Sequence, residues 1–267
     1  MSKVITYSLI LIAVFIGWAT MAQAYEVAEV KDGATIRGQI TFSGVPPGPL
    51  QFEVEKNPEV CGHQRSLVKV EVQNGLLKGA VVILEGIESG KPFAKQEFQG
   101  NAPGKGTFQY KGGETLGLRV NTENCNFGPF TGVLTPDEAV RFGNKDSIKH
   151  VLHTFVALDT RGNVLRTLHN RDIHPDDEFD RTFDSDKLKE SRVVRITCNR
   201  HDFMQNWMYV VKNPYFAISD EEGHFSIDNI PPGRYKLRAW HPVLGLQEQH
   251  VHVMPGMVLG ADLAFSE

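Results

Sequence analysis

The sequence predicts an all-β protein made of two β-sandwiches, one associated with or inserted in the other. The 25 glycines and 14 prolines divide the chain into short segments. Most of these segments alternate apolar and polar residues or are rich in β-branched residues, and almost none sustains a helical period. A charged stretch at 185–192, "SDKLKESR", is the one helix candidate, and a turn-rich loop would fit it equally well. Strands are expected near residues 34–42, 66–72, 79–87, 115–121, 138–144, 149–158, 191–198, 206–212, 224–228, 234–241 and 248–254.

The first 24 residues have the features of a secretory signal peptide. One early charge at Lys3 precedes the apolar run "VITYSLILIAVFIGWA", and small residues at Ala22 and Ala24 suggest cleavage before Tyr25. A membrane anchor is the alternative, but the run has only 16 residues and lacks a basic stop-transfer flank. We therefore expect export to the periplasm, with no membrane association after cleavage.

Composition excludes several classes of protein. The net charge of −4 is spread along the chain, which argues against nucleic-acid binding. Three cysteines are too few for a disulfide scaffold, and an odd number in an exported chain leaves a free thiol or a metal ligand. A catalytic copper enzyme would need a further histidine cluster around a second metal, and the sequence offers none that is convincing. We therefore do not expect an enzyme.

Two β modules are interleaved along the chain. The C-terminal part, residues 213–267, has a hairpin turn at Gly223 and a second turn at Pro231-Pro232-Gly233. This part resembles the second half of a carboxypeptidase regulatory-like (transthyretin-like) β-sandwich. The first half is matched within residues 25–97, by Gly38-Gln39-Ile40 and by "GAVVIL" at 79–84. Residues 98–212 would then be an insertion, with the stretch 99–107 as its boundary.

Three soft metal donors lie close together in the inserted segment. Cys198, His201 and Met204 have the spacing C-x2-H-x2-M between two expected strands. Thiolate, imidazole and thioether ligands together select copper over hard cations. A fourth ligand is expected from an upstream strand, where His150 and His153 would face opposite sides of the sheet, so that only one of them can bind.

The segment resembles a cupredoxin, a Greek-key blue-copper sandwich, and its short loop is most similar to the amicyanin type. The resemblance implies one copper ion bound by His150, Cys198 and His201, with Met204 as the weak axial ligand. It also places His201 near the surface as the edge through which electrons pass. Val151 departs from the family, in which an Asn commonly follows the first histidine and supports the cysteine loop.

Alternatives exist for individual residues. Met208 is a second possible axial ligand, although packing beside Trp207 suits it better. Cys61 and Cys125 could form a disulfide, stay free or bind a second metal, and export favours the disulfide. A wider resemblance, to exported bacterial proteins that combine the two modules, rests on Asn57-Pro58-x-x-Cys61-Gly62 and on Cys125-x-Phe127-x-Pro129.

The expected function is a periplasmic carrier of single electrons between redox protein partners. A copper-holding or copper-delivery protein would use the same ligands without an electron-transfer partner. A β-sandwich interaction module without metal is the third possibility. The acidic stretch 174–186, "HPDDEFDRTFDSD", is expected to be a solvated loop that could recognise a partner by charge.

Overall fold

The computed structural model describes residues 25–93, 99–100, 106–107, 116–136, 139–157, 164–188 and 191–267. The expected signal peptide, residues 1–24, and most of the stretch 99–107 lie outside these residues. Within them the regular secondary structure is almost entirely β-strand, with two four-residue helices, α1 (Pro58–Cys61) and α2 (Ser185–Leu188). The predicted all-β class is confirmed. None of the described helices is long and apolar enough to cross a membrane.

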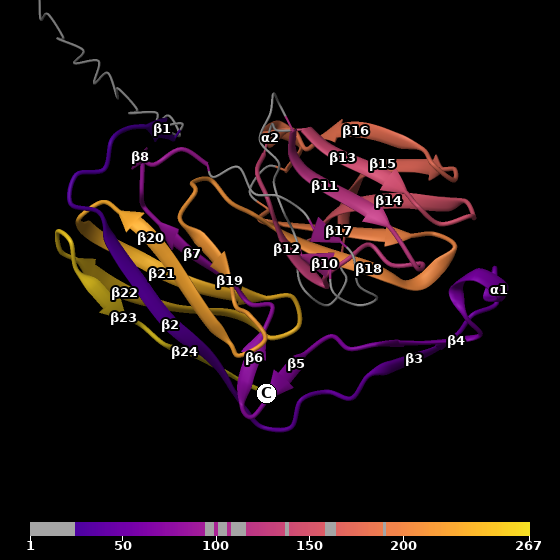
Figure 1. Ribbon diagram of the computed structural model, residues 1–267, viewed down its shortest axis with the longest axis horizontal. Coiled ribbons are helices and arrows are strands. Elements are labelled where there is room, and N and C mark those ends of the chain that lie inside the picture. Colours follow the sequence, from indigo (N-terminus) through magenta and orange to yellow (C-terminus); the bar gives the residue numbers. More distant parts are fainter. Residues whose placement is uncertain are drawn as a thin grey trace, which may run out of the picture.

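The four main sheets form two sandwiches that lie side by side (Figure 1). In the first sandwich, strands from both ends of the chain pair with one another, so that residues between them form an insertion. Its outer sheet has the order β20 (His224–Ile230), β2 (Ala34–Ser43), β6 (Leu76–Lys78), β5 (Glu71–Gln73), and β23 (Val258–Gly260) and β24 (Leu263–Ser266) also pair with β2. Its inner sheet has the order β19 (Phe216–Ile218), β7 (Val81–Glu85), β21 (Gly233–His241), β22 (Gly245–Val253).

Two glycines show why the first sandwich closes as it does. Gly223 has a φ of 68°, the left-handed conformation expected for the hairpin turn before β20. Gly38 lies where β2 meets the C-terminal segment, and a Cβ there would come within 2.0 Å of the Ala261 carbonyl oxygen. Both positions therefore require the absence of a side chain.

The second sandwich is formed by the inserted segment. Its inner sheet has the order β12 (Thr131–Leu134), β18 (His201–Val210), β17 (Val193–Cys198), β14 (His150–Ala157), β15 (Val164–Ile173). Its outer sheet has the order β11 (Leu116–Thr122), β13 (Ala139–Asn144), β16 (Glu178–Thr182). Two further strand pairs are short: β1 (Glu26–Val27) with β8 (Ser89–Gly90), and β9 (Gln99–Gly100) with β10 (Gly106–Thr107).

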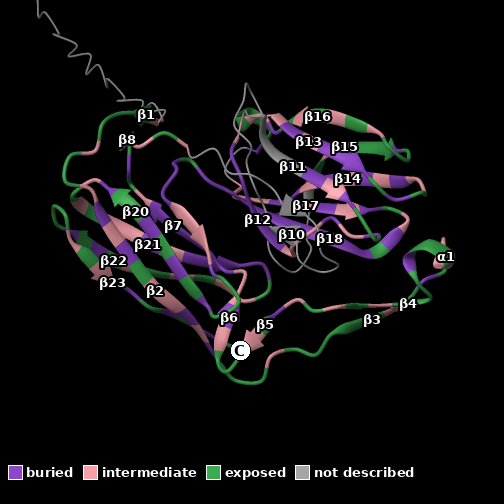
Figure 2. Cartoon of the chain, viewed as in Figure 1, coloured by how far each residue is buried: buried purple, intermediate pink, exposed green. Residues whose placement is uncertain are grey.

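The two sandwiches share an apolar layer. On β7, Val82 and Leu84 face the core of the first sandwich, whereas Val81 and Ile83 face the second. There they join Trp207 and Tyr209 of β18 and Trp240 of β21, and the last two rings lie 5.2 Å apart. The alternation of side chains along a strand thus lets the inner sheets contribute to two cores each. The interface appears in Figure 2 as buried strands between the sandwiches.

An arm extends from the first sandwich to the far end of the second (Figure 1). It consists of β3 (Leu50–Glu53), helix α1 and β4 (Gln64–Leu67), with β3 and β4 paired as a hairpin. Helix α1 begins at Asn57-Pro58 and ends at Gly62, whose φ is 84°. Val54 and Cys61 of this arm are buried in the core of the second sandwich.

Three expectations about local structure were wrong. The segment between the strands expected at 191–198 and 206–212 was expected to be a loop, but β18 already begins at His201 and includes Met204. The single strand expected at 66–72 is divided into β4 and β5, because the chain leaves the arm here and returns to the first sandwich. The stretch 174–186, expected to be a loop, contains edge strand β16, which pairs with β13. Its Phe179 stacks on Phe142 while charged neighbours point outward, as is common at sheet edges.

Trp240 tests the apolar layer between the sandwiches. Its side chain is 4% exposed, and we expect Trp240→Ala to lower the free energy of unfolding by about 3–5 kcal/mol, as for other buried aromatic residues. Urea unfolding measures this loss. Leu246, the register partner of Trp240 on β22, is 43% exposed and provides the control. If Trp240→Ala and Leu246→Ala lowered the free energy of unfolding by equal, small amounts, the apolar layer would not stabilise the protein as proposed.

Candidate metal centre

His150 is the first residue of strand β14 and points into the core of the second sandwich. Its side chain is 0% exposed, and Leu152 shares the same inward face. His153 lies on the opposite face, as the alternation of the strand predicts. The two histidines therefore cannot both reach the same buried site.

Cys198 and His201 flank a two-residue turn between β17 and β18. Cys198 ends β17 on the inward face that Val194 and Ile196 also occupy, and it pairs with His201. The next pair is Thr197 with Gln205, so the register slips by three residues on β18. An irregularity of this kind redirects side chains near a functional site. Here it lies directly beside the cysteine.

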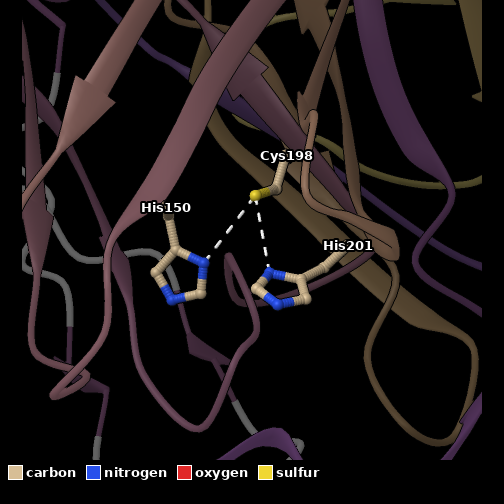
Figure 3. A group of neighbouring side chains, drawn as sticks. All are labelled: His150, Cys198 and His201. Atoms are coloured by element: carbon tan, nitrogen blue, oxygen red, sulfur yellow. Dashed lines mark hydrogen bonds between the residues drawn. The ribbon is translucent and has the colours of Figure 1, made fainter. Parts of the chain in front are cut away.

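The three donors converge on one point (Figure 3). The Cys198 Sγ atom lies 3.7 Å from Nδ1 of His150 and 3.6 Å from Nδ1 of His201. The donor atoms of all three residues lie within 4.8 Å of one another, and all three side chains are buried. The structure thus brings together three of the four ligands predicted from the sequence.

This donor set fits a metal ion. Bonds of about 2.0–2.3 Å from a metal to imidazole and thiolate place neighbouring donors of a trigonal site about 3.5–4.0 Å apart. The two measured separations fall in that range. A thiolate with two imidazoles is the ligand set that suits copper, and a weak thioether completes it in blue-copper sites.

Met204 is in the same core and is 0% exposed. Met208 is equally buried there, but it lies four residues further along β18, about 13 Å in an extended strand. Met208 pairs with Val194, at the end of β17 away from the turn. Met204 is therefore the better placed of the two methionines for a fourth ligand.

The outer nitrogens of both histidines are held by oxygen acceptors. The His150 Nε2–H group donates to Oδ2 of Asp146 at 2.9 Å, and the His201 Nε2–H group donates to the carbonyl oxygen of Lys56 at 3.1 Å. A ring that carries its proton on Nε2 can present an unprotonated Nδ1 to a metal. These contacts orient both rings toward Cys198.

The departure at Val151 is compensated in two ways. The backbone N–H of Val151 donates to Cys198 Sγ at 3.4 Å, and its carbonyl accepts from the backbone N–H of Asn199 at 3.0 Å. The His153 ring also contacts the Asn199 side chain, with 2.9 Å between Nδ1 and Oδ1. The turn that carries the cysteine is thus supported by His153 instead of an Asn at position 151.

His201 does not lie near the surface, and the expectation of an exposed electron-transfer edge was wrong. Its side chain is only 2% exposed, because the arm covers it. Lys56 and Cys61 of the arm contact its Nε2 atom, and the Phe203 ring lies beside it with 5.6 Å between ring centroids. Arg65 of β4 lies over Phe203 at 5.1 Å from its centroid.

A disulfide fixes this arm. Cys61 of α1 is bonded to Cys125, 64 residues further on, and the Cys61 sulfur lies 3.7 Å from His201 Nε2. Arg65 donates to the carbonyl oxygens of Cys61 and Asn124, one on each side of the disulfide. The structure therefore contains the pairing that export favoured, and Cys198 is the free thiol.

The environment of Cys198 favours the thiolate. Burial alone would raise the pKa of its thiol, but its polar contacts with the His150 and His201 rings and hydrogen bonds from the backbone N–H groups of Val151 and Arg200 outweigh burial and lower the pKa to about 6. For His150, burial would lower the pKa, whereas Asp146 and Cys198 raise it above its ordinary value. A thiolate is the form that binds metals.

No family model matches the chain, and no curated protein matches it. Among solved structures, a reduced amicyanin variant is 18% identical over 37% of this chain and 83% of its own, with a TM-score of 0.28. A purple cupredoxin from Nitrosopumilus maritimus is 20% identical over 35% of this chain and 98% of its own, with a TM-score of 0.27.

TM-scores this low say nothing about function. The candidate metal centre is therefore inferred from the geometry of His150, Cys198 and His201 alone. The resemblance of the first sandwich to the carboxypeptidase regulatory-like fold stays a prediction from sequence motifs.

The thiolate predicts how the metal-free protein responds to pH. The Cys198 thiol should titrate near pH 6, well below the value of about 8.5 for an ordinary thiol. Its contribution to stability is then complete above about pH 8.5 and is lost as the pH falls through about 6. Thiolate ultraviolet absorbance measures the titration, with Cys198→Ser as the blank. A midpoint at or above the ordinary value would contradict the hydrogen-bonded thiolate.

Proposed function

We propose that the protein is an exported periplasmic copper protein, with one type 1-like copper site, that carries single electrons between redox protein partners. One observation carries the proposal. Cys198 Sγ and the Nδ1 atoms of His150 and His201 meet at 3.7 and 3.6 Å in a buried site. This combination of donors favours copper over hard cations.

The copper ion would supply a one-electron couple. The residues of the chain would bind the ion and shield it from water. Cys198 would be kept as a thiolate by hydrogen bonds from the Val151 and Arg200 backbone N–H groups. Met204 would be the fourth, weaker ligand. Phe203, 8% exposed, would help to exclude water.

A rigid frame supports a carrier. The ligands come from three adjacent strands, β14, β17 and β18, the histidine rings are fixed by Asp146 and Lys56, and a disulfide holds the covering arm. Such a frame would keep the ligand positions similar in both oxidation states. The donors are buried away from solvent, which suits a carrier better than an enzyme, and we propose a carrier.

The covered His201 ring favours a second candidate, a copper-holding or copper-delivery protein. An electron leaving through this ring would have to cross the arm, whereas a cover suits retention of the ion. Two assays separate the candidates: electron exchange with small redox proteins, and Cu(I) transfer to a chelator. Fast exchange with retained copper supports the carrier. Slow exchange, with transfer accelerated in the double variant Cys61→Ser/Cys125→Ser, supports holding.

The ligand assignment predicts which histidine matters. The protein from Tyr25 onward should bind one copper ion and show an intense visible thiolate-to-copper band. His150→Ala should abolish this band, as should Cys198→Ala. His153→Ala should keep it, shifted, because His153 supports the turn from outside. Visible absorption and electron paramagnetic resonance provide the readout. A colourless copper-loaded protein would refute the proposal.

A further inference from the structure

Asp146 is a buried carboxylate that the ligand motif does not include. It lies four residues before His150, in the connection between β13 and β14, and only 8% of the residue is exposed. A carboxylate is costly to bury unless hydrogen bonds compensate for the loss of water. Here the compensating hydrogen bonds come from the His150 ring and from the backbone N–H group of Cys125, a disulfide cysteine.

The Oδ2 atom of Asp146 joins two parts of the site. It accepts the Nε2–H group of His150 at 2.9 Å and the backbone N–H group of Cys125 at 3.0 Å. Cys125 is bonded to Cys61, whose sulfur touches the other histidine, His201. One carboxylate oxygen therefore links the His150 ring to the disulfide that holds the arm.

A second layer holds Asp146 in place. Asn144 is 2% exposed, and its Oδ1 atom accepts the backbone N–H of Asp146 at 3.0 Å and the Thr122 hydroxyl at 2.6 Å. Its Nδ2 atom donates to the carbonyl oxygens of Ile148 and Ile173. These hydrogen bonds hold the connection before β14 from both sides and support the position of Asp146 beside His150.

The two histidines are consequently held by different acceptors. His201 donates to a neutral backbone carbonyl, whereas His150 donates to a charged carboxylate. A carboxylate that accepts from a ligand imidazole fixes the tautomer and makes the ring a stronger electron donor to the metal. The charge also favours the more positive oxidation state of a nearby ion.

We propose that Asp146 is a positioning residue of the copper site: it fixes the His150 ring with Nδ1 toward Cys198, lowers the reduction potential, and ties this ligand to the Cys61–Cys125 disulfide. The inference rests on the proposed copper function. The part of the inference that concerns the orientation of the His150 ring can be tested in the protein without metal.

The first experiment uses the metal-free protein. Nitrogen NMR of histidine-labelled protein, at a pH where the His150 ring is neutral, should find the ring proton on Nε2 in the wild type. In Asp146→Ala the preference should weaken or reverse. A wild-type ring protonated on Nδ1 would overturn the orientation, whether or not the protein binds copper.

The second experiment uses copper-loaded protein and the variant Asp146→Asn, which keeps an acceptor oxygen and removes the charge. At a fixed ambient potential the Cu(I)/Cu(II) ratio should rise about tenfold, which is a potential about 59 mV higher. Asp146→Ala should also weaken copper binding by about 10–100-fold. If the alanine variant fails to fold, the asparagine variant alone decides.

The matched control is Glu123→Gln, which removes the same charge from an exposed side chain two residues before Cys125. This variant should change the Cu(I)/Cu(II) ratio less than twofold. Equal shifts in Asp146→Asn and Glu123→Gln would overturn a specific role for Asp146. Failure of the wild type to bind copper would instead refute the proposed function, and the NMR result would still stand.

Discussion

Strand β18 is buried on both faces, and the arrangement of the molecule depends on this constraint. One face contributes Met204 and Met208 to the core that contains the candidate metal centre, and the other contributes Trp207 and Tyr209 to the layer shared with the first sandwich. If the whole of β18 were shifted by one residue relative to its neighbours, the two faces would be exchanged, and the aromatic rings would enter the metal core. The position of the Cys198–His201 turn is therefore fixed by packing on both sides.

The two histidines of the candidate metal centre each use both ring nitrogens. Each histidine uses Nδ1 toward Cys198 and gives its Nε2–H to an oxygen, one from Asp146 and one from the Lys56 carbonyl. The first acceptor comes from the inserted sandwich and the second from the arm of the other sandwich. The two modules thus complete one site between them, and the disulfide joins the parts that do so.

Much of the site could be predicted from local sequence, because its main signals are local. The spacing of Cys198, His201 and Met204 and the alternation along "HVLHTFVA" place donors on one turn and one inward face. The burial of His201 could not be predicted in this way. Its cover comes from residues more than 130 positions earlier, and nothing near His201 in the sequence indicates them. Asp146 was missed for a related reason: its spacing from His150 matches no ligand pattern, and its role depends on a contact with Cys125.

Copper K-edge X-ray absorption of the copper-loaded chain tests the central claim most directly, that one thiolate and two imidazoles converge on a single ion. We predict a nearest shell of one sulfur and two nitrogen scatterers, with the sulfur lost in Cys198→Ser. A shell of only nitrogen and oxygen scatterers in the unaltered protein would contradict the account.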